Sequence, residues 1–250
     1  AFPPDGSTLV GEPARLFSMR FPRQSVRSVK RRMGSDWTFT APNNKLYTPP
    51  EITARILIEL KHNTEQFLGV PVTDAVITVP AYFDDAQRTA TLDAATIAGL
   101  NVLRLLNEPT AAALAAGYAS SRPAKVLVFD FGGGTLDVSL LDVADGITEV
   151  VAVSGDTALG GDDFDEALTS YLVDEIDLTY GTDLRSDPVR MAALTFAAEA
   201  AKIHLSTHHT ANLVIDDLTD ASGAPVTFSR TVRRAEFEAV TSHLVTRAHV

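Results

Sequence analysis

The segment from Asp130 to Asp137 combines residue types that suit the binding of a phosphate. It reads Asp-Phe-Gly-Gly-Gly-Thr-Leu-Asp and lies between two apolar runs, which predicts a strand, a tight turn and a second strand. Successive glycine N–H groups in such a turn can form an anion-binding concavity. The two flanking carboxylates would then need a neutralising cation, and hydrated Mg²⁺ is one. The alternative is a plain glycine hairpin whose aspartates only form the turn.

A second glycine pair, Gly160-Gly161, precedes the start of a predicted helix. Three acidic residues follow it, at positions 162, 163 and 165. Glycines ahead of a helix suit a phosphate because the N-terminus of a helix attracts anions. The same acids also suit the helix dipole without any ligand. The pattern leaves both interpretations open.

Pro80 and Glu108 each end an apolar run that is predicted to be a strand. Ligands in open α/β sheets bind beyond the carboxyl ends of the strands. We therefore expect both residues, and the turn after Asp130, at one edge of a sheet if their strands are neighbours. A carboxylate at Glu108 could orient a water or bridge two lobes, or it could be only a first-turn acid of the next helix.

Residues 13–35 form a basic segment within an acidic chain. The segment contains no acid, and it could be a solvated face, a nucleic-acid patch or a wall that faces an anion. The formal net charge of the whole chain is −11, which argues against general affinity for nucleic acid. The basic residues are Arg15, Arg20, Arg23, Arg27, Lys30, Arg31 and Arg32.

The composition is that of a soluble globular protein, and 250 residues suffice for one large or two modest domains. The chain has no cysteine, which excludes disulfides and thiolate sites and fits a reducing compartment. Its start lacks the pattern of a signal peptide, and its most apolar run, 111–119, is too short to span a bilayer. A start without methionine suggests a piece of a longer protein. Walker A, G-x-G-x-x-G, G-x-S-x-G and H-E-x-x-H motifs are all missing from the sequence.

The remaining pattern alternates strands with helices, which predicts an α/β protein with a sheet covered by helices. A linker is expected over 120–124, and the last helix has no stop signal before the chain ends. Besides the glycine hairpin, strands are predicted over 37–40, 72–79, 102–106, 148–153, 211–215 and 226–228. Helices are predicted after 48, over 84–98, 110–117, around 164–176, over 188–205 and around 237–244.

Four blocks resemble signatures of the nucleotide-binding domain of Hsp70 chaperones, of the bacterial DnaK type. They occur in the order and with the gaps of that family. The blocks are Val79-Pro-Ala-Tyr-Phe-Asp-Asp-Ala-Gln-Arg-Thr-Ala-Thr91, Leu106-Asn-Glu-Pro-Thr-Ala-Ala-Ala-Leu114, Val128-Phe-Asp-Phe-Gly-Gly-Gly-Thr-Leu-Asp137 and Gly155-Asp-Thr-Ala-Leu-Gly-Gly-Asp-Asp-Phe-Asp165.

The resemblance implies an actin-like ATPase (ribonuclease H-like) fold, with two lobes around a cleft for ATP or ADP and Mg²⁺. The family's first phosphate loop would precede Ala1 and its adenosine loop would follow Val250, so a partial domain is expected. The implied subdomains are 1–70 (IB-like), 71–121 (partial IA), 122–159 (partial IIA), 160–232 (IIB) and 233–250 (the return to IIA).

The resemblance also implies roles for particular residues. The catalytic residues would be Lys30, Glu108, Asp130 and Thr135, with Asp130 holding Mg²⁺ through water. The nucleotide-binding residues would be Gly132, Gly133, Gly134, Asp137, Gly160 and Gly161, together with Glu199, Lys202 and Ser206 on the adenosine side. Pro80 and Arg88 match a proline and an arginine that relay the nucleotide state to the rest of such chaperones.

The function implied is ATP binding and hydrolysis by a cytoplasmic chaperone that assists protein folding. The implied partners are a peptide-binding domain outside this chain, a J-domain co-chaperone and a nucleotide exchange factor, with no nucleic acid and no membrane. Two rivals remain: another actin-fold ATPase or sugar kinase, and a fragment that does not hydrolyse ATP. Ile203 replaces an arginine that stacks on adenosine in some members of the family.

Overall fold

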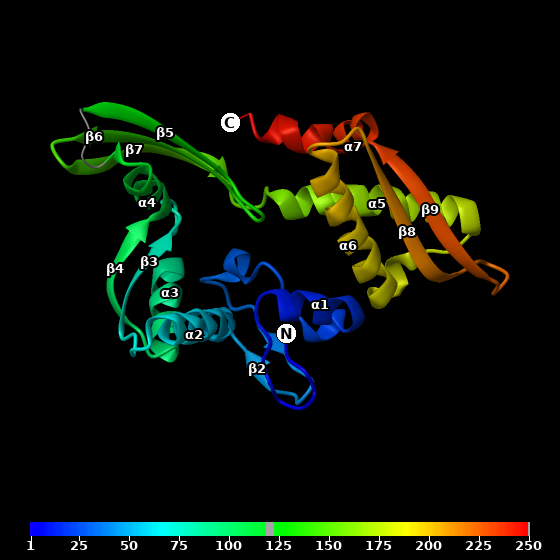
Figure 1. Ribbon diagram of the computed structural model, residues 1–250, viewed down its shortest axis with the longest axis horizontal. Coiled ribbons are helices and arrows are strands. Elements are labelled where there is room, and N and C mark those ends of the chain that lie inside the picture. Colours follow the sequence, from blue (N-terminus) through cyan, green and yellow to red (C-terminus); the bar gives the residue numbers. More distant parts are fainter. Residues whose placement is uncertain (119–122, 250) are drawn as a thin grey trace.

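The computed structural model describes residues 1–118 and 123–249. Most of the predicted linker, and the boundary expected between 121 and 122, lie outside these residues. The chain forms two lobes (Figure 1), each with its own helices and small sheets. In the described part, the strands form four separate sheets, β1-β2, β3-β4, β5-β6-β7 and β8-β9. The alternation of strands and helices is therefore as predicted, but the strands do not join one sheet.

The first lobe is built around two parallel strands. The strands β3 (Asp74–Val79) and β4 (Asn101–Asn107) pair with Val79 opposite Asn107. Between them runs α3 (Asp85–Ile97), whose N-cap Asp84 accepts a hydrogen bond from the Gln87 amide at 2.8 Å. α4 (Glu108–Ala115) follows β4 directly, so it begins two residues earlier than predicted.

α2 (Pro49–Leu68) packs against α3 and confirms the helix predicted after residue 48. Thr48 and Glu51 form its capping box, and Gly69 ends it at a φ of 71°. Such a positive φ favours glycine because a Cβ would crowd the backbone. Small residues at the contact, Ala54 and Ala94, allow the close approach of the two helices.

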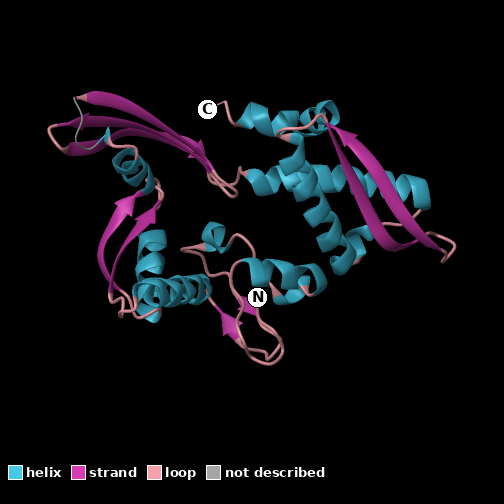
Figure 2. Ribbon diagram, viewed as in Figure 1, coloured by secondary structure: helices cyan, strands magenta, loops and turns pink. Residues whose placement is uncertain are grey.

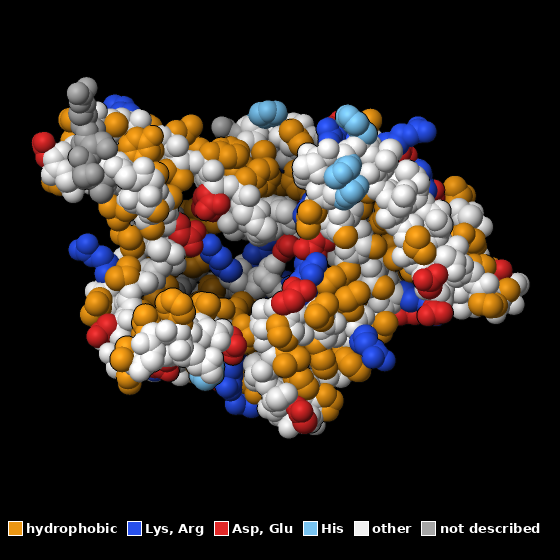
Figure 3. Space-filling model, in the orientation of Figure 1, with side chains coloured by type: hydrophobic (Ala, Val, Ile, Leu, Met, Phe, Trp, Pro, Cys, Tyr) orange, Lys and Arg blue, Asp and Glu red, His pale blue; other side chains and the backbone are white. Residues whose placement is uncertain are grey.

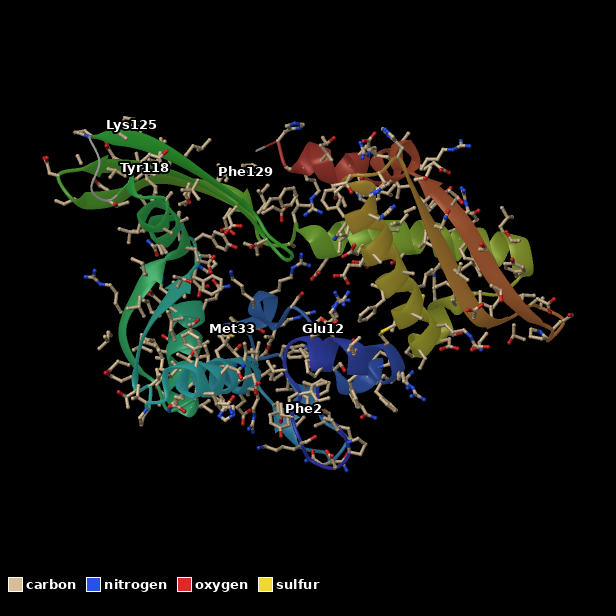
Figure 4. The ribbon with its side chains drawn as sticks, viewed as in Figure 1. Phe2, Glu12, Met33, Tyr118, Lys125 and Phe129 are labelled. Carbon is tan, nitrogen blue, oxygen red and sulfur yellow. The ribbon has the colours of Figure 1, made fainter. Side chains whose placement is uncertain are left out.

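The N-terminal segment contains a helix that the sequence did not predict. α1 (Glu12–Arg20) buries only Ser18, so it lacks the apolar stripe by which helices are detected. Figure 4 shows Glu12 at its start and Phe2 near the β1–β2 hairpin. Phe2 stacks on Tyr47 with 4.6 Å between ring centroids. The short elements here are η1 (Pro22–Gln24), η2 (Val29–Arg32), β1 (Phe39–Thr40) and β2 (Leu46–Tyr47).

The predicted glycine hairpin is present. β5 (Ala124–Phe131) and β6 (Leu136–Ala144) are antiparallel, with Asp130 opposite Asp137. β7 (Ile147–Asp156) adds a third strand. One face of this sheet packs on Ala113 of α4, while Leu127 and Phe129 are exposed.

The second lobe holds the largest apolar cluster, formed between two helices and a hairpin (Figure 2). Its centre includes Leu172, Ile176, Leu194 and Val232, each at most 1% exposed. The final helix ends inside the chain, with Ala248 as its C-cap, although the sequence showed no stop signal. The elements are α5 (Gly161–Tyr180), η4 (Leu184–Ser186), α6 (Pro188–Leu205), β8 (Thr210–Thr219), β9 (Pro225–Arg233) and α7 (Arg234–Arg247).

Residues 1–118 and 123–249 contain no helix with the length and apolarity needed to cross a membrane.

Candidate functional site

Charged side chains gather around a hollow in the middle of the molecule, between the two lobes (Figure 3). On the first lobe, Lys30 of η2 donates hydrogen bonds to both carboxylate oxygens of Glu108, at 2.9 and 3.1 Å. Glu108 directly follows the end of β4 and is the first residue of α4. It is therefore both the residue after a strand and an acid in the first turn of a helix. Because β3 and β4 are parallel neighbours, Pro80 and Glu108 leave the same edge of the sheet, as expected. The expectation was wrong for the turn after Asp130, which belongs to the separate sheet β5-β6-β7.

The glycine turn carries a buried carboxylate. Asp137 is 8% exposed and accepts a hydrogen bond from the Thr135 hydroxyl at 2.9 Å. Burial raises the pKa of the Asp137 carboxyl, and the negative charge of Asp130 adds to this effect. The Thr135 hydroxyl and the charge of Lys30 oppose the rise in pKa. The field of Lys30 therefore reaches the turn, although the two segments are about a hundred residues apart in the chain.

Tyr82 belongs to this cluster and was missed as a site residue. Burial raises the pKa of its phenol to about 12, and the negative charges of Asp137 and Glu108 act in the same direction. Its hydroxyl is buried, and side-chain interactions with Thr135 and Asp137 also act on its pKa. The sequence did contain a signal, since Tyr82 lies in the block that begins with Val79, but only Pro80 and Arg88 of that block were assigned roles.

The start of α5 binds the glycine turn directly. The amides of Gly161 and Asp162 donate to the carbonyls of Gly132 and Gly133, at 3.0 and 2.8 Å. These two helix donors thus hold the turn itself. A Cβ on Gly160 would lie 2.5 Å from the carbonyl carbon of Gly133, so only glycine permits this contact. The two glycine motifs, separate in the sequence, form one structure.

The acids that follow Gly161 all have partners. Asp163 accepts from the Gly160 amide at 2.7 Å and so caps α5. Asp162 accepts from the hydroxyl of Ser28 in the first lobe. Asp165 is 3% exposed and pairs with Lys202 at 2.8 Å, where burial raises the pKa of the carboxyl and the lysine opposes the rise.

Part of the basic segment faces the acids of the second lobe. Arg15 pairs with Glu199 at 3.1 Å, and Arg27 lies 3.7 Å from the same carboxylate. Arg31 donates to the Gly134 carbonyl at 2.7 Å and to Asp163 at 2.6 Å. Those three arginines thus form a wall against acidic groups, while Arg20 and Arg23 make no ion pair in the described residues.

The three residues expected on the adenosine side point in different directions. Glu199 faces the arginines of the first lobe. Lys202 contacts Asp165 and the Gly161 carbonyl at 3.0 Å. Ser206 lies just after α6, as its C-cap, and is exposed. A pocket of about 330 Å³ between α6 and α7 is lined by Lys202, Leu205, Ser206, Arg234, Phe237 and Glu238.

The two residues expected to relay the nucleotide state lie behind the cluster. Pro80 is buried, and its carbonyl accepts from the Phe83 amide at 3.2 Å. The guanidinium of Arg88 donates to the Phe83 carbonyl and to the Asn107 side chain, both at 3.0 Å. Arg88 therefore ties the turn that carries Tyr82 to the residue before Glu108.

In the described part of the chain, no three His, Cys, Asp or Glu side chains cluster as direct metal ligands. The chemistry of the turn nevertheless fits Mg²⁺ held through water. Asp130 and Asp137 are opposite each other in the hairpin, and the charge of Asp130 raises the pKa of Asp137. A hydrated cation between them would relieve that repulsion, and Mg²⁺ usually keeps several waters.

The sequence of this chain is similar to proteins of the Hsp70 family. A family model described as "Hsp70 protein" matches residues 38–250. The chaperone protein DnaK of Thermoplasma acidophilum is 48% identical over 248 residues, which are 99% of this chain and 40% of that protein. The chain thus spans less than half the length of this curated relative. It belongs to the Hsp70 family and carries part of the actin-like ATPase fold of that family.

Proposed function

We propose that this chain is the ATP-binding and ATP-hydrolysing part of an Hsp70-type chaperone that assists protein folding. The observation that carries the proposal is the Lys30–Glu108 pair, at 2.9 Å, beside the turn of Thr135 and Asp137. A cation, a carboxylate and glycine amides from three distant segments meet there, which suits phosphoryl transfer to water. The finer assignments of residue roles are likewise proposals.

The role of each residue follows from its chemistry. Lys30, the Thr135 hydroxyl and the amides of the glycine turn donate to the terminal phosphate and stabilise the charge that develops there. Glu108, released from Lys30 when the phosphate takes its place, orients the attacking water. Asp130 would hold Mg²⁺ through water, and the ion would supply neutralising charge to the phosphates. One preorganised donor of this kind typically contributes roughly 2.7–4 kcal/mol to lowering the barrier.

The adenosine would lie on the side of Lys202 and Ser206, next to the pocket between α6 and α7. The links from the Gly132 carbonyl to the Gly161 amide, and from the Gly161 carbonyl to Lys202, support this placement. Through these two hydrogen bonds Gly161 connects the phosphate turn to Lys202, on the proposed adenosine side. Glu199 would contribute once it separates from Arg15 and Arg27.

The expected subdomains are proposed with the same boundaries, and the apolar clusters give them partial support. Most of the largest cluster falls within 160–232, and α7 packs back on Leu136 of β6, as a return to the earlier subdomain requires. At residue 70 the support is weaker, because α2 packs on α3 across the boundary.

The proposed partners are a peptide-binding domain, a J-domain co-chaperone and a nucleotide exchange factor, in the cytoplasm. Their support is membership of the Hsp70 family. A sugar kinase is the less favoured candidate. It would use glycine turns but would not need the block around Glu108 that resembles the chaperones.

The decisive substitution is Glu108→Gln in the full-length protein. We expect the rate of ATP hydrolysis to fall about 10²-fold, the typical contribution of a positioned acid–base group. The Kd for Mg-ATP, measured by titration calorimetry, should change little because the phosphate donors remain. Glu59→Gln, on the exposed surface of α2, is the matched control. Equal losses in binding and turnover would contradict the role of Glu108.

A further inference from the structure

Arg31 makes two contacts that no part of the mechanism above uses. Its Nε donates to the Gly134 carbonyl at 2.7 Å, and its Nη2 donates to Asp163 at 2.6 Å. The Arg31 side chain is 24% exposed and that of Asp163 is 17% exposed. The arginine lies in η2 of the first lobe, whereas Gly134 lies in the turn between β5 and β6 and Asp163 lies in α5.

The two acceptors belong to the two glycine motifs. Gly134 is the last glycine of the phosphate turn. Asp163 caps α5 by accepting from the Gly160 amide at 2.7 Å. One guanidinium therefore fastens both the turn and the helix start, which already bind each other through the Gly161 and Asp162 amides. A Cβ on Gly134 would lie only 3.2 Å from Nε of Arg31, so the arginine side chain packs closely against the backbone of Gly134.

Arg31 also neighbours the proposed catalytic lysine. Lys30 and Arg31 are consecutive residues of η2. Lys30 pairs with Glu108 on its own lobe, whereas Arg31 reaches across to the other lobe. Arg31 thus fixes the position of η2 relative to the phosphate turn. Because Lys30 is the preceding residue, its position relative to the turn is fixed as well. Arg15 and Arg27 also cross between the lobes, but Arg15 reaches Glu199 on α6, and Arg27 reaches Glu199 and lies 4.0 Å from Asp162; neither contacts the glycine turn.

We propose that Arg31 is a positioning residue that sets the distance between Lys30 and the phosphate turn. A guanidinium suits this task because its planar fork can donate to two acceptors at once. A lysine at this position would keep the charge but would lack the rigid planar fork that holds two acceptors in a fixed geometry. The proposal rests on the proposed function in one respect, namely that the ligand of the turn is a nucleotide.

The first test needs no nucleotide. Hydrogen exchange of the Gly161 and Asp162 amides reports the contact between helix start and turn in this chain. We expect Arg31→Ala to accelerate their exchange about tenfold, the order expected for loss of a charge-assisted hydrogen bond. Arg23→Ala removes the same charge from the same segment, where it makes no ion pair, and should leave the exchange unchanged. Unchanged exchange in Arg31→Ala would overturn the proposal.

The second test compares ligands by titration calorimetry. We expect Arg31→Ala to weaken Mg-ATP and Mg-ADP about tenfold while leaving adenosine within about twofold, because only the phosphates depend on the turn. Arg31→Lys should behave like Arg31→Ala. Equal weakening of ATP and adenosine would indicate a general loss of structure and would overturn the positioning role.

A double-mutant cycle links the arginine to its acceptor. Asp163→Asn keeps an oxygen for the Gly160 amide and removes the charge that Arg31 binds. The double variant should exchange no faster than Arg31→Ala alone, since both changes break one interaction. Additive effects would overturn the proposal. If the unmodified chain binds no nucleotide, the proposed function fails for this chain, and the exchange experiments still decide the role of Arg31.

Discussion

At the scale of single residues, Asp137 is a site residue whose charged carboxylate lowers the stability of the fold. Its carboxyl is buried, it accepts a hydrogen bond from the Thr135 hydroxyl, and its pKa is raised above the reference value of 3.8. The folded chain therefore binds this proton more tightly than the unfolded chain does. Stability from this group is present below pH 3.8 and is lost as the pH rises through the raised pKa. At neutral pH the buried charge opposes folding.

Replacing this carboxylate by an amide should therefore stabilise the chain. We expect Asp137→Asn to raise the Tm at pH 7 by about 2–4 °C, the shift that corresponds to roughly 1 kcal/mol at this size. The gain should fade as the pH falls towards 4, because the native carboxyl is then protonated too. Calorimetric scans between pH 3.5 and 7.5 measure it. A gain that grew on acidification would contradict the raised pKa.

Residue types predicted the glycine turn and the position of Glu108 at the end of a strand, and the resemblance to Hsp70 chaperones pointed to Lys30. The groups around these residues were not predicted. Tyr82 and Arg31 acquire their significance from partners that are distant in sequence. Arg31 contacts residues 103 and 132 positions away, and no spacing rule within a segment detects such a pair. The sequence showed only a basic segment with three open interpretations, and the structure distinguishes the members that face acids from those that do not.

At the scale of elements, the helices with a capping box were predictable because the caps are local. Asp84 and Gln87 exchange hydrogen bonds at 2.8 and 3.1 Å, a pattern that the sequence alone displays. α1 has no such box and no apolar stripe, and its position depends on contacts between Arg15 and the second lobe. Tertiary contacts therefore decide that helix, which is why the sequence did not predict it.

The cap of α3 provides a test of this reasoning. Asp84→Ala removes the acceptor of the Gln87 amide and should cost about 1 kcal/mol of the free energy of unfolding. Chemical denaturation, with circular dichroism as the signal, measures the change. Asp84→Asn keeps an acceptor and should restore most of the loss. A full loss in the asparagine variant would mean that charge, and not capping, stabilises this helix start.

The contact between the two glycine motifs provides a second test at this scale. In Gly160→Ala the Cβ would lie 2.5 Å from the Gly133 backbone, so α5 and the turn must separate. We expect a loss of about 1–3 kcal/mol in the free energy of unfolding, as for other overpacked sites. Gly133→Ala is the control, since its Cβ would meet nothing closer than Asp162 at 4.0 Å. Equal stability of the two variants would contradict the close packing.

At the scale of the whole molecule, charge joins residues 1–118 directly to residues 155–249, whereas apolar packing connects these two parts only through the sheet β5-β6-β7. Among the described residues, no cluster of buried apolar side chains combines residues 1–118 with residues 155–249. The contacts that do cross are ion pairs and hydrogen bonds of Arg15, Arg27, Ser28 and Arg31, with Phe196 beneath Arg15. A ligand that enters the cleft can therefore move residues 155–249 relative to residues 1–118 without separating an apolar cluster shared directly by these two parts.

The orientation of the lobes should consequently depend on salt. Screening shortens the Debye length from about 10 Å at 0.1 M to about 3 Å at 1 M salt, and exposed ion pairs are weak individually. We expect the radius of gyration from small-angle X-ray scattering to grow by about 1 Å over this range, against roughly 18 Å for a compact chain of this length.

Glu199→Gln, which removes the partner of Arg15 and Arg27, should produce most of this growth already at 0.1 M salt. Glu175→Gln breaks a pair with Arg230 inside the second lobe and should leave the radius unchanged. A radius that is the same in all three proteins and at both salt concentrations would show that the lobes are held by something other than these charges.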